Sequence, residues 1–153
     1  MRAVVPMTPE QQQLLTEWQG KVRRAQIAHY AAANRCDRRQ RYLGVPVITF
    51  SAITGATIFA DVSDKRLFLA IGVASVATAI LAGLQTFLQL PDRAEKHRAA
   101  AQRYGDLKRQ CDAVLANAPT PADGAIDSIR IQWDAANKSS PLAVSSIWVR
   151  QSQ

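Results

Sequence analysis

The sequence predicts an all-α membrane protein: a two-span antiparallel transmembrane hairpin whose N- and C-terminal extensions are helical and form a cytoplasmic bundle. Residues 42–60 carry no charge over 19 positions, and residues 67–90 carry none over 24. About 20 helical residues, rising about 1.5 Å each, cross a hydrocarbon core about 30 Å thick, so each run is long enough to span it. The alternative is a soluble bundle with two buried core helices, but uncharged helices this long are uncommon in small soluble domains.

Residues 1–41 are predicted to form a cytoplasmic amphipathic helix. Thr8 and Gln11 form a capping box and Pro9 suits the first helical position, so a helix should begin there. The N-terminus has no apolar core followed by a small-residue cleavage site, and no cleaved signal peptide is expected. Apolar and small side chains recur every three or four residues on one expected inner face: Leu14, Trp18, Val22, Ala25, His29, Ala32 and Cys36.

The two uncharged runs differ in apolar content. Residues 67–90 contain 12 Leu, Ile, Phe or Val residues, which contribute about 4 to 7 kcal/mol to insertion, so this span should insert alone. Residues 42–60 contain eight, worth about 2 to 5 kcal/mol, together with Pro46 and several hydroxyl side chains, so this span should need its neighbour. The extracytoplasmic link, residues 61–66, is short enough to force an antiparallel hairpin.

Basic residues near the span ends predict the orientation. Ten Lys or Arg residues flank the hairpin, and two, Lys65 and Arg66, lie in the link. The positive-inside rule therefore places both termini in the cytoplasm. The expected location is the inner (plasma) membrane. Anionic lipid headgroups attract such residues by about 1 kcal/mol each, which explains the clusters without a nucleic acid. The expected partner is the lipid bilayer, and no direct nucleic-acid ligand is expected.

The chain after the second span is also predicted to be helical. Residues 91–117 should form a cytoplasmic helix, with Pro91 either in its first turn or at a kink in a continuing helix. Residues 118–153 should form a loop and a short helix with Ile126, Ile129 and Trp133 aligned. The inner face of the helix over residues 91–117 is expected to hold Leu90, Ala94, His97, Ala101, Tyr104, Cys111 and Leu115.

A stripe of polar and small side chains follows the second span. Its members, spaced three or four residues apart, share one helix face: Ser75, Thr78, Ala82, Gln85 and Gln89. Unpaired amides in hydrocarbon cost several kcal/mol, so the stripe should face protein or water. Two interpretations stay open. The stripe lines a pore in a homo-oligomer, or it forms hydrogen bonds between packed helices. For Gln89 alone, a third interpretation is that the side chain snorkels to the membrane interface.

Other candidate positions are structural. Small residues at four-residue spacing favour close helix packing and association, and they include Ser51, Gly55, Ala79 and Gly83. His29 and His97 lie on apolar faces, where a packing role is favoured over a pH switch or a metal pair. Cys36 and Cys111 are expected to be free thiols. No phosphate-binding loop, nucleophile elbow, His-Glu-x-x-His or Cys-x-x-Cys motif is present, and no catalytic residue, cofactor or metal is predicted.

Three loose patterns point to a family. They are a His followed by small residues in "AHYAAANRC" from Ala28, Leu43-Gly44-x-Pro46 at the start of the first run, and Ala-x-x-His-Arg-x-Ala-Ala-x-x-Tyr from Ala94 to Tyr104. With them, residues 10–117 resemble the SLATT domain, the two-transmembrane effector associated with SMODS and SLOG proteins. The resemblance implies a non-enzymatic effector of a bacterial conflict (antiphage) system, which assembles into a membrane pore when an upstream sensor or nucleotide-signalling protein fires.

An alternative from another class is a non-conducting membrane anchor. In that interpretation the hairpin only holds the chain at the inner leaflet. Residues 118–153, which match no motif of the resembled family, then tether a partner protein.

Overall fold

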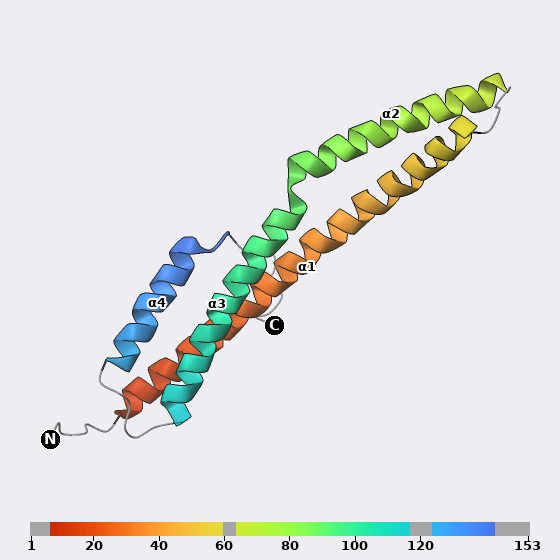
Figure 1. Ribbon diagram of the computed structural model, residues 1–153. Coiled ribbons are helices and arrows are strands. Elements are labelled where there is room, and N and C mark those ends of the chain that lie inside the picture. The colour runs from red at the N-terminus through yellow and green to blue at the C-terminus, as the bar shows by residue number, and fades with distance from the viewer. Residues whose placement is uncertain (1–6, 60–63, 117–123, 143–153) are drawn as a thin grey trace. The chain divides into compact units, whose positions relative to one another are not determined.

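The computed structural model describes residues 7–59, 64–116 and 124–142, and within these ranges every regular element is an α-helix (Figure 1). The all-α class is therefore confirmed for the described residues. The helices are α1 (Pro9–Phe59), α2 (Lys65–Leu88), α3 (Leu90–Ala116) and α4 (Ala125–Ser139).

The helices belong to two compact units. Residues up to Ala33 and from Glu95 onward form one unit, the bundle, which contains the first half of α1, most of α3, and α4. Residues Asn34–Ala94 form the other, the hairpin, which contains the second half of α1, α2 and the start of α3. Each unit has its own packing and is described separately.

The start of α1 follows from the predicted capping box. The Thr8 backbone N–H donates to Gln11 Oε1 at 3.0 Å, and the Gln11 backbone N–H donates to Thr8 Oγ1 at 3.2 Å. These two bonds satisfy donors that have no partner within the helix. The helix then continues without a break through Pro46 to Phe59, so the predicted boundary between residues 41 and 42 is not the end of a helix.

The break between α2 and α3 lies at Gln89. This residue has φ 45° and ψ 43°, in the left-handed region, which costs a residue with a side chain about 1 to 2 kcal/mol. α3 begins at Leu90, with Pro91 in its first turn. This start confirms one of the two interpretations of Pro91, the first turn of a new helix. A proline fits there because it loses no intrahelical hydrogen bond.

Side chains from three helices form the core of the bundle. Leu15 and Val22 of α1, Cys111 of α3 and Ile129 of α4 are its largest fully buried members. The prediction for Leu14 was wrong: Leu15 is 0% exposed and Leu14 is 38% exposed. Leu15 lies seven residues before Val22 and continues the alternating three- and four-residue spacing of the inner face, which Leu14 does not.

The short helix α4 packs on the bundle as predicted. Ile129 is 2% exposed, and Ile126 and Trp133 pack partly buried against the same core. The rings of Trp133 and Trp18 meet edge to face, with centroids 5.5 Å apart. Tyr104 Oη donates a hydrogen bond to Asn137 Oδ1 at 2.8 Å, which fixes α4 to α3.

Two neighbouring helical segments form the hairpin. α2 lies alongside the second half of α1 (Figure 1), and none of the residues of α2 is buried. The N-cap of α2 is Asp64, whose carboxylate accepts from the Arg66 backbone N–H at 2.8 Å. Most of the predicted link, residues 60–63, lies outside the described residues.

Candidate functional site

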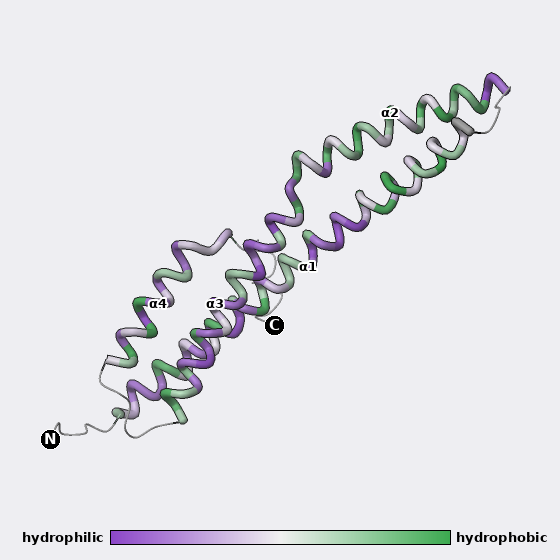
Figure 2. Tube along the Cα trace, viewed as in Figure 1, coloured by the Kyte–Doolittle hydropathy of each residue, from purple (hydrophilic) through white to green (hydrophobic). Residues whose placement is uncertain are grey.

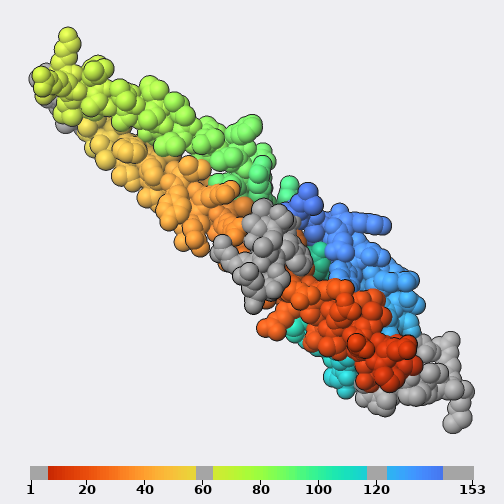
Figure 3. All heavy atoms as spheres, turned by 180° about the vertical axis from the view of Figure 1, so that it is seen from behind, coloured from red at the N-terminus to blue at the C-terminus, as the bar shows by residue number. Residues whose placement is uncertain are grey.

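The surface of the hairpin is apolar on its outward faces. Figure 2 shows hydrophobic residues along α2, and Figure 3 shows one face on which no other element covers this helix. Phe68, Ile80 and Phe87 of α2 are 72%, 66% and 82% exposed, and Ile48 of α1 is 70% exposed. A continuous exposed surface of this kind is typical of protein that lipid or another chain covers.

One stretch of the described residues is long and apolar enough to cross a membrane. It lies within Lys65–Ala116, and none of its most apolar window is buried inside the chain. The core helix of a soluble protein would be mostly buried instead. Residues 42–59 are not part of a second such stretch, in keeping with their lower apolar content.

The polar stripe on α2 divides between two environments. Thr78, Ala82 and Gln85 are half-buried, whereas Ser75 and Gln89 are exposed. The two hydroxyls find partners on their own helix: Ser75 Oγ donates to the Ile71 carbonyl at 2.9 Å, and Thr78 Oγ1 donates to the Ala74 carbonyl at 2.8 Å. These two hydroxyls therefore do not require a partner on another helix or chain.

The Gln85 side-chain amide has no such hydrogen-bond partner. Its Nε2 atom is buried and has no hydrogen-bond acceptor among the described residues. A Cβ added at Gly44 of α1 would lie 3.6 Å from this Nε2, so the amide packs against the glycine backbone. One helical turn before Gly44, the Oε1 atom of Gln40 is also buried without a donor. A buried donor and a buried acceptor thus remain unsatisfied within the hairpin.

Sequence reasoning found Gln85 but missed its contact with Gly44 and the unsatisfied Gln40 one turn before that glycine. Gln40 lies inside the basic cluster before the first uncharged run, where the arginines dominate the pattern. The available signal was the four-residue spacing of Gln40 and Gly44, which places a small residue beside an amide on one face.

The predicted helix-packing positions do not contact a neighbouring helix closely within the described chain. A Cβ added at Gly55 or Gly83 would meet nothing within 4 Å. Ser51 and Ala79 are exposed. Small residues at these positions are therefore open to a second copy of the chain or to lipid.

In the bundle, His29 and His97 come together. Their Nδ1 atoms lie 3.1 Å apart, so one ring donates a hydrogen bond and the other accepts it. His29 is 4% exposed, and its ring stacks on Tyr104 with centroids 5.4 Å apart and an interplanar angle of 16°. Sequence reasoning placed both histidines on inner faces but did not identify the contact with Tyr104.

Burial disfavours the charged form of both histidines. Desolvation lowers the pKa of His29, and the nearby His97 lowers it further. Desolvation also lowers the pKa of His97. Within the described residues, no group of three or more His, Cys, Asp or Glu side chains is placed to hold a metal ion.

An acidic side chain links α1 and α3 on the same unit. The Asp112 carboxylate accepts from Lys108 Nζ at 2.6 Å and also from the Gln19 side-chain amide. The hydrogen bond from Lys108 lowers the pKa of Asp112, and the one from Gln19 lowers it further. Asp112 is half-exposed, so solvent screens the ion pair.

Comparison with protein families gives a match. The sequence profile of the SMODS and SLOG-associating 2TM effector domain family 4 matches residues 11–130. This range extends beyond residue 117, where the predicted resemblance ended, and includes the first residues of α4. No curated protein and no solved structure matches the chain.

Proposed function

The chain belongs to the SMODS and SLOG-associating 2TM effector domain family 4, and from this membership and the surface of its hairpin we propose that it is a pore-forming membrane effector of a bacterial conflict system. The observation that carries the proposal is α2: a 24-residue helix without a buried residue, whose large apolar side chains are exposed. In water this surface would be costly, whereas lipid covers it without loss.

Both arms of the hairpin cross the inner membrane in this proposal, with both termini in the cytoplasm. The second half of α1 inserts together with α2, because its own apolar content is lower. Support comes from the basic side chains, which are concentrated before residue 42 and after residue 92. A cysteine introduced in the link should react with an impermeant maleimide added outside intact cells, and one at residue 150 should not.

Several copies form the pore, and the Gln85 side chain lies at its lining or at the contacts between subunits. The support is the unsatisfied amide: Gln85 Nε2 is buried without an acceptor, and Gln40 Oε1 without a donor. A small rotation of the helices on assembly gives these atoms water or a second chain as partner. The exposed Gly83, Ala79 and Ser51 allow close approach between copies. An upstream sensor or nucleotide-signalling protein provides the trigger.

Dye or ion release from liposomes tests the pore. Purified wild-type protein should release the contents in its active state, and Thr78→Leu combined with Gln85→Leu should reduce the release severalfold, because the lining becomes apolar. Ala77→Leu is the control for added helix hydrophobicity: Ala77 is exposed on the same helix and has no stripe member three or four residues away, so it lies off the stripe.

Two outcomes would contradict the pore. Equal loss of release with Ala77→Leu would assign the effect to general helix hydrophobicity. Vesicles that stay tight in every tested state, while the protein is fully inserted, would favour a non-conducting anchor instead.

A further inference from the structure

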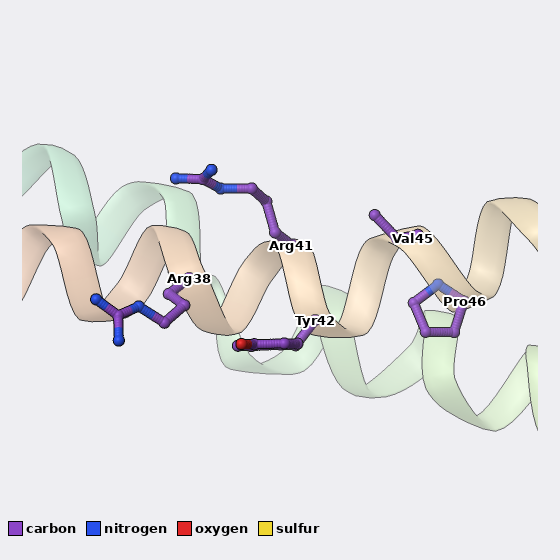
Figure 4. A pocket seen from close by; sticks show the side chains of 5 residues that line it. All are labelled: Arg38, Arg41, Tyr42, Val45 and Pro46. Atoms are coloured by element: carbon purple, nitrogen blue, oxygen red, sulfur yellow. The ribbon is translucent and has the colours of Figure 1, made fainter.

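A hollow of about 710 Å³ lies on the outward face of α1 where the charged part of the helix ends. Five of the described residues line it: Arg38, Arg41, Tyr42, Val45 and Pro46 (Figure 4). The first four follow one helix face at spacings of three, one and three residues. Arg41 is the last charged residue before the uncharged run, so the hollow extends across the boundary between the two.

The side chains of the hollow are sorted by polarity along the helix. Figure 4 shows both arginine side chains extending toward the N-terminal end of the segment, while Val45 and Pro46 lie at the other end. The Tyr42 ring lies between these groups, with its hydroxyl directed toward the arginine end. Over about 12 Å, the rise along the helix from Arg38 to Pro46, the surface passes from cationic through aromatic to apolar.

The cationic end of the hollow is available to a ligand. Among the described residues, no ion pair or hydrogen bond engages the guanidinium of Arg38 or Arg41, and both side chains are exposed. Tyr42 is 72% exposed and Val45 is 61% exposed. A guanidinium group is well suited to a phosphate, because it offers two parallel N–H donors.

The apolar end of the hollow indicates which class of phosphate-containing ligand fits it. Val45 and Pro46 lie near the start of the uncharged run, and a free nucleotide or inorganic phosphate would leave them in contact with water. A phospholipid matches all three parts: its phosphate meets the arginines, its glycerol region meets Tyr42, and its acyl chains meet the apolar end.

We propose that the hollow formed by Arg38, Arg41, Tyr42, Val45 and Pro46 is a specific seat for the phosphate headgroup of an anionic phospholipid of the inner leaflet. The proposal rests on the membrane insertion stated above. It adds that two particular arginines, and not the basic cluster as a whole, recognise the lipid and fix the depth of α1.

The test compares two double variants with the same change in charge. Arg38→Gln with Arg41→Gln removes the seat. Arg35→Gln with Arg39→Gln removes two exposed arginines of the same helical segment that do not line the hollow. Native mass spectrometry of the full chain in detergent measures retention of phosphatidylglycerol against phosphatidylcholine. Circular dichroism checks that each variant keeps its helix content.

Wild-type protein should retain phosphatidylglycerol in preference to phosphatidylcholine. The seat variant should weaken that preference by roughly ten- to thirtyfold, the equivalent of two headgroup contacts, and the control variant by less than about threefold. Equal losses in the two variants, or no preference in wild type, would overturn the proposal.

Two further arms separate the ligand source and the underlying function. Excess glycerol phosphate, a soluble headgroup, should not displace phosphatidylglycerol, and full displacement would identify a general phosphate site and overturn the lipid assignment. Flotation with neutral phosphatidylcholine vesicles tests insertion itself: failure of wild type to float would contradict the membrane proposal. Flotation without any anionic-lipid preference would contradict only the seat.

Discussion

The Nδ1 atoms of His29 and His97 lie 3.1 Å apart in the bundle and share one hydrogen bond between α1 and α3. Tyr104 extends this contact, because its ring stacks on His29 while its hydroxyl donates to Asn137 of α4. One imidazole pair is therefore in contact with all three helices of the bundle, directly or through Tyr104. Two protonated rings would turn two N–H groups toward each other and lose the bond.

The stability of the bundle should fall as the pH drops below about 6.5. The pKa values of His29 and His97 are lowered in the folded chain, so protons bind the unfolded chain more readily. The contribution is fully present above the unfolded pKa, and it is lost as the pH falls through the folded pKa values. Thermal unfolding of the full chain in detergent at neutral pH and at about pH 5 measures the loss.

The double variant His29→Asn with His97→Asn is the control, because Asn keeps a short polar side chain and does not titrate. It should show a much smaller drop over the same pH range. The carboxylates of Asp112 and Glu17 have pKa values lowered from 3.8 and 4.5, so they titrate below this range. An equal drop in the double variant would show that the histidine pair is not its source.

The buried face of α1 predicts different effects of mutation at two neighbouring leucines. Leu15→Ala should destabilise the bundle by about 2 to 5 kcal/mol, because the side chain is fully buried and leaves a cavity. Leu14→Ala, at a position 38% exposed, should cost about 1 kcal/mol or less. Denaturant unfolding followed by tryptophan fluorescence compares the two. A larger effect at Leu14 would contradict the burial of Leu15 in the bundle core.

The helix starts and much of the bundle core were predictable because they depend on local chemistry. The Thr8–Gln11 capping box needs only four residues, and the inner faces of α3 and α4 follow from regular spacing. The prediction erred at Leu14 because Leu14 and Leu15 are both apolar and adjacent. The strictly alternating three- and four-residue spacing, which fits Leu15, was the available signal.

The candidate site was less predictable because its features depend on two segments at once. The stripe on α2 was visible in the sequence, but its division into half-buried Thr78 and Gln85 and exposed Ser75 depends on where α1 lies. The contact of Gln85 with Gly44 joins residues 41 positions apart, which spacing rules within one helix do not relate. The left-handed Gln89 was hidden for another reason: glutamine carries no turn preference.

The ring contact between Trp18 and Trp133 should decide whether α4 stays on the bundle. An edge-to-face pair is worth about 0.5 to 1.5 kcal/mol beyond the area that it buries. Trp133→Ala should therefore increase tryptic cleavage after Arg130 and Lys138, both on α4. Ile131→Ala, on the same helix and 64% exposed, should cleave at the wild-type rate. If trypsin cleaves the Trp133→Ala variant no faster than wild type, the polar contacts alone hold α4 on the bundle.

The two native cysteines should report opening of the bundle, so no further cysteine has to be introduced. Cys111 is 0% exposed, and burial, with the neighbouring Asp112 charge, raises the pKa of its thiol. Its thiolate, the reactive form, is therefore both scarce and inaccessible in the folded chain. Cys36 is only half-buried. A maleimide should modify Cys36 first, and Cys111 only when the bundle opens or denaturant is added.

Single variants assign the two reactions. Cys36→Ser should leave a chain that reacts only on opening, and Cys111→Ser a chain that reacts fully when folded. In the first variant, modification of Cys111 should accelerate below pH 6.5 relative to a free thiol control, because protonation of the His29–His97 pair weakens the same α1–α3 contact. Rapid modification of Cys111 at neutral pH in the intact bundle would contradict the packed core around it.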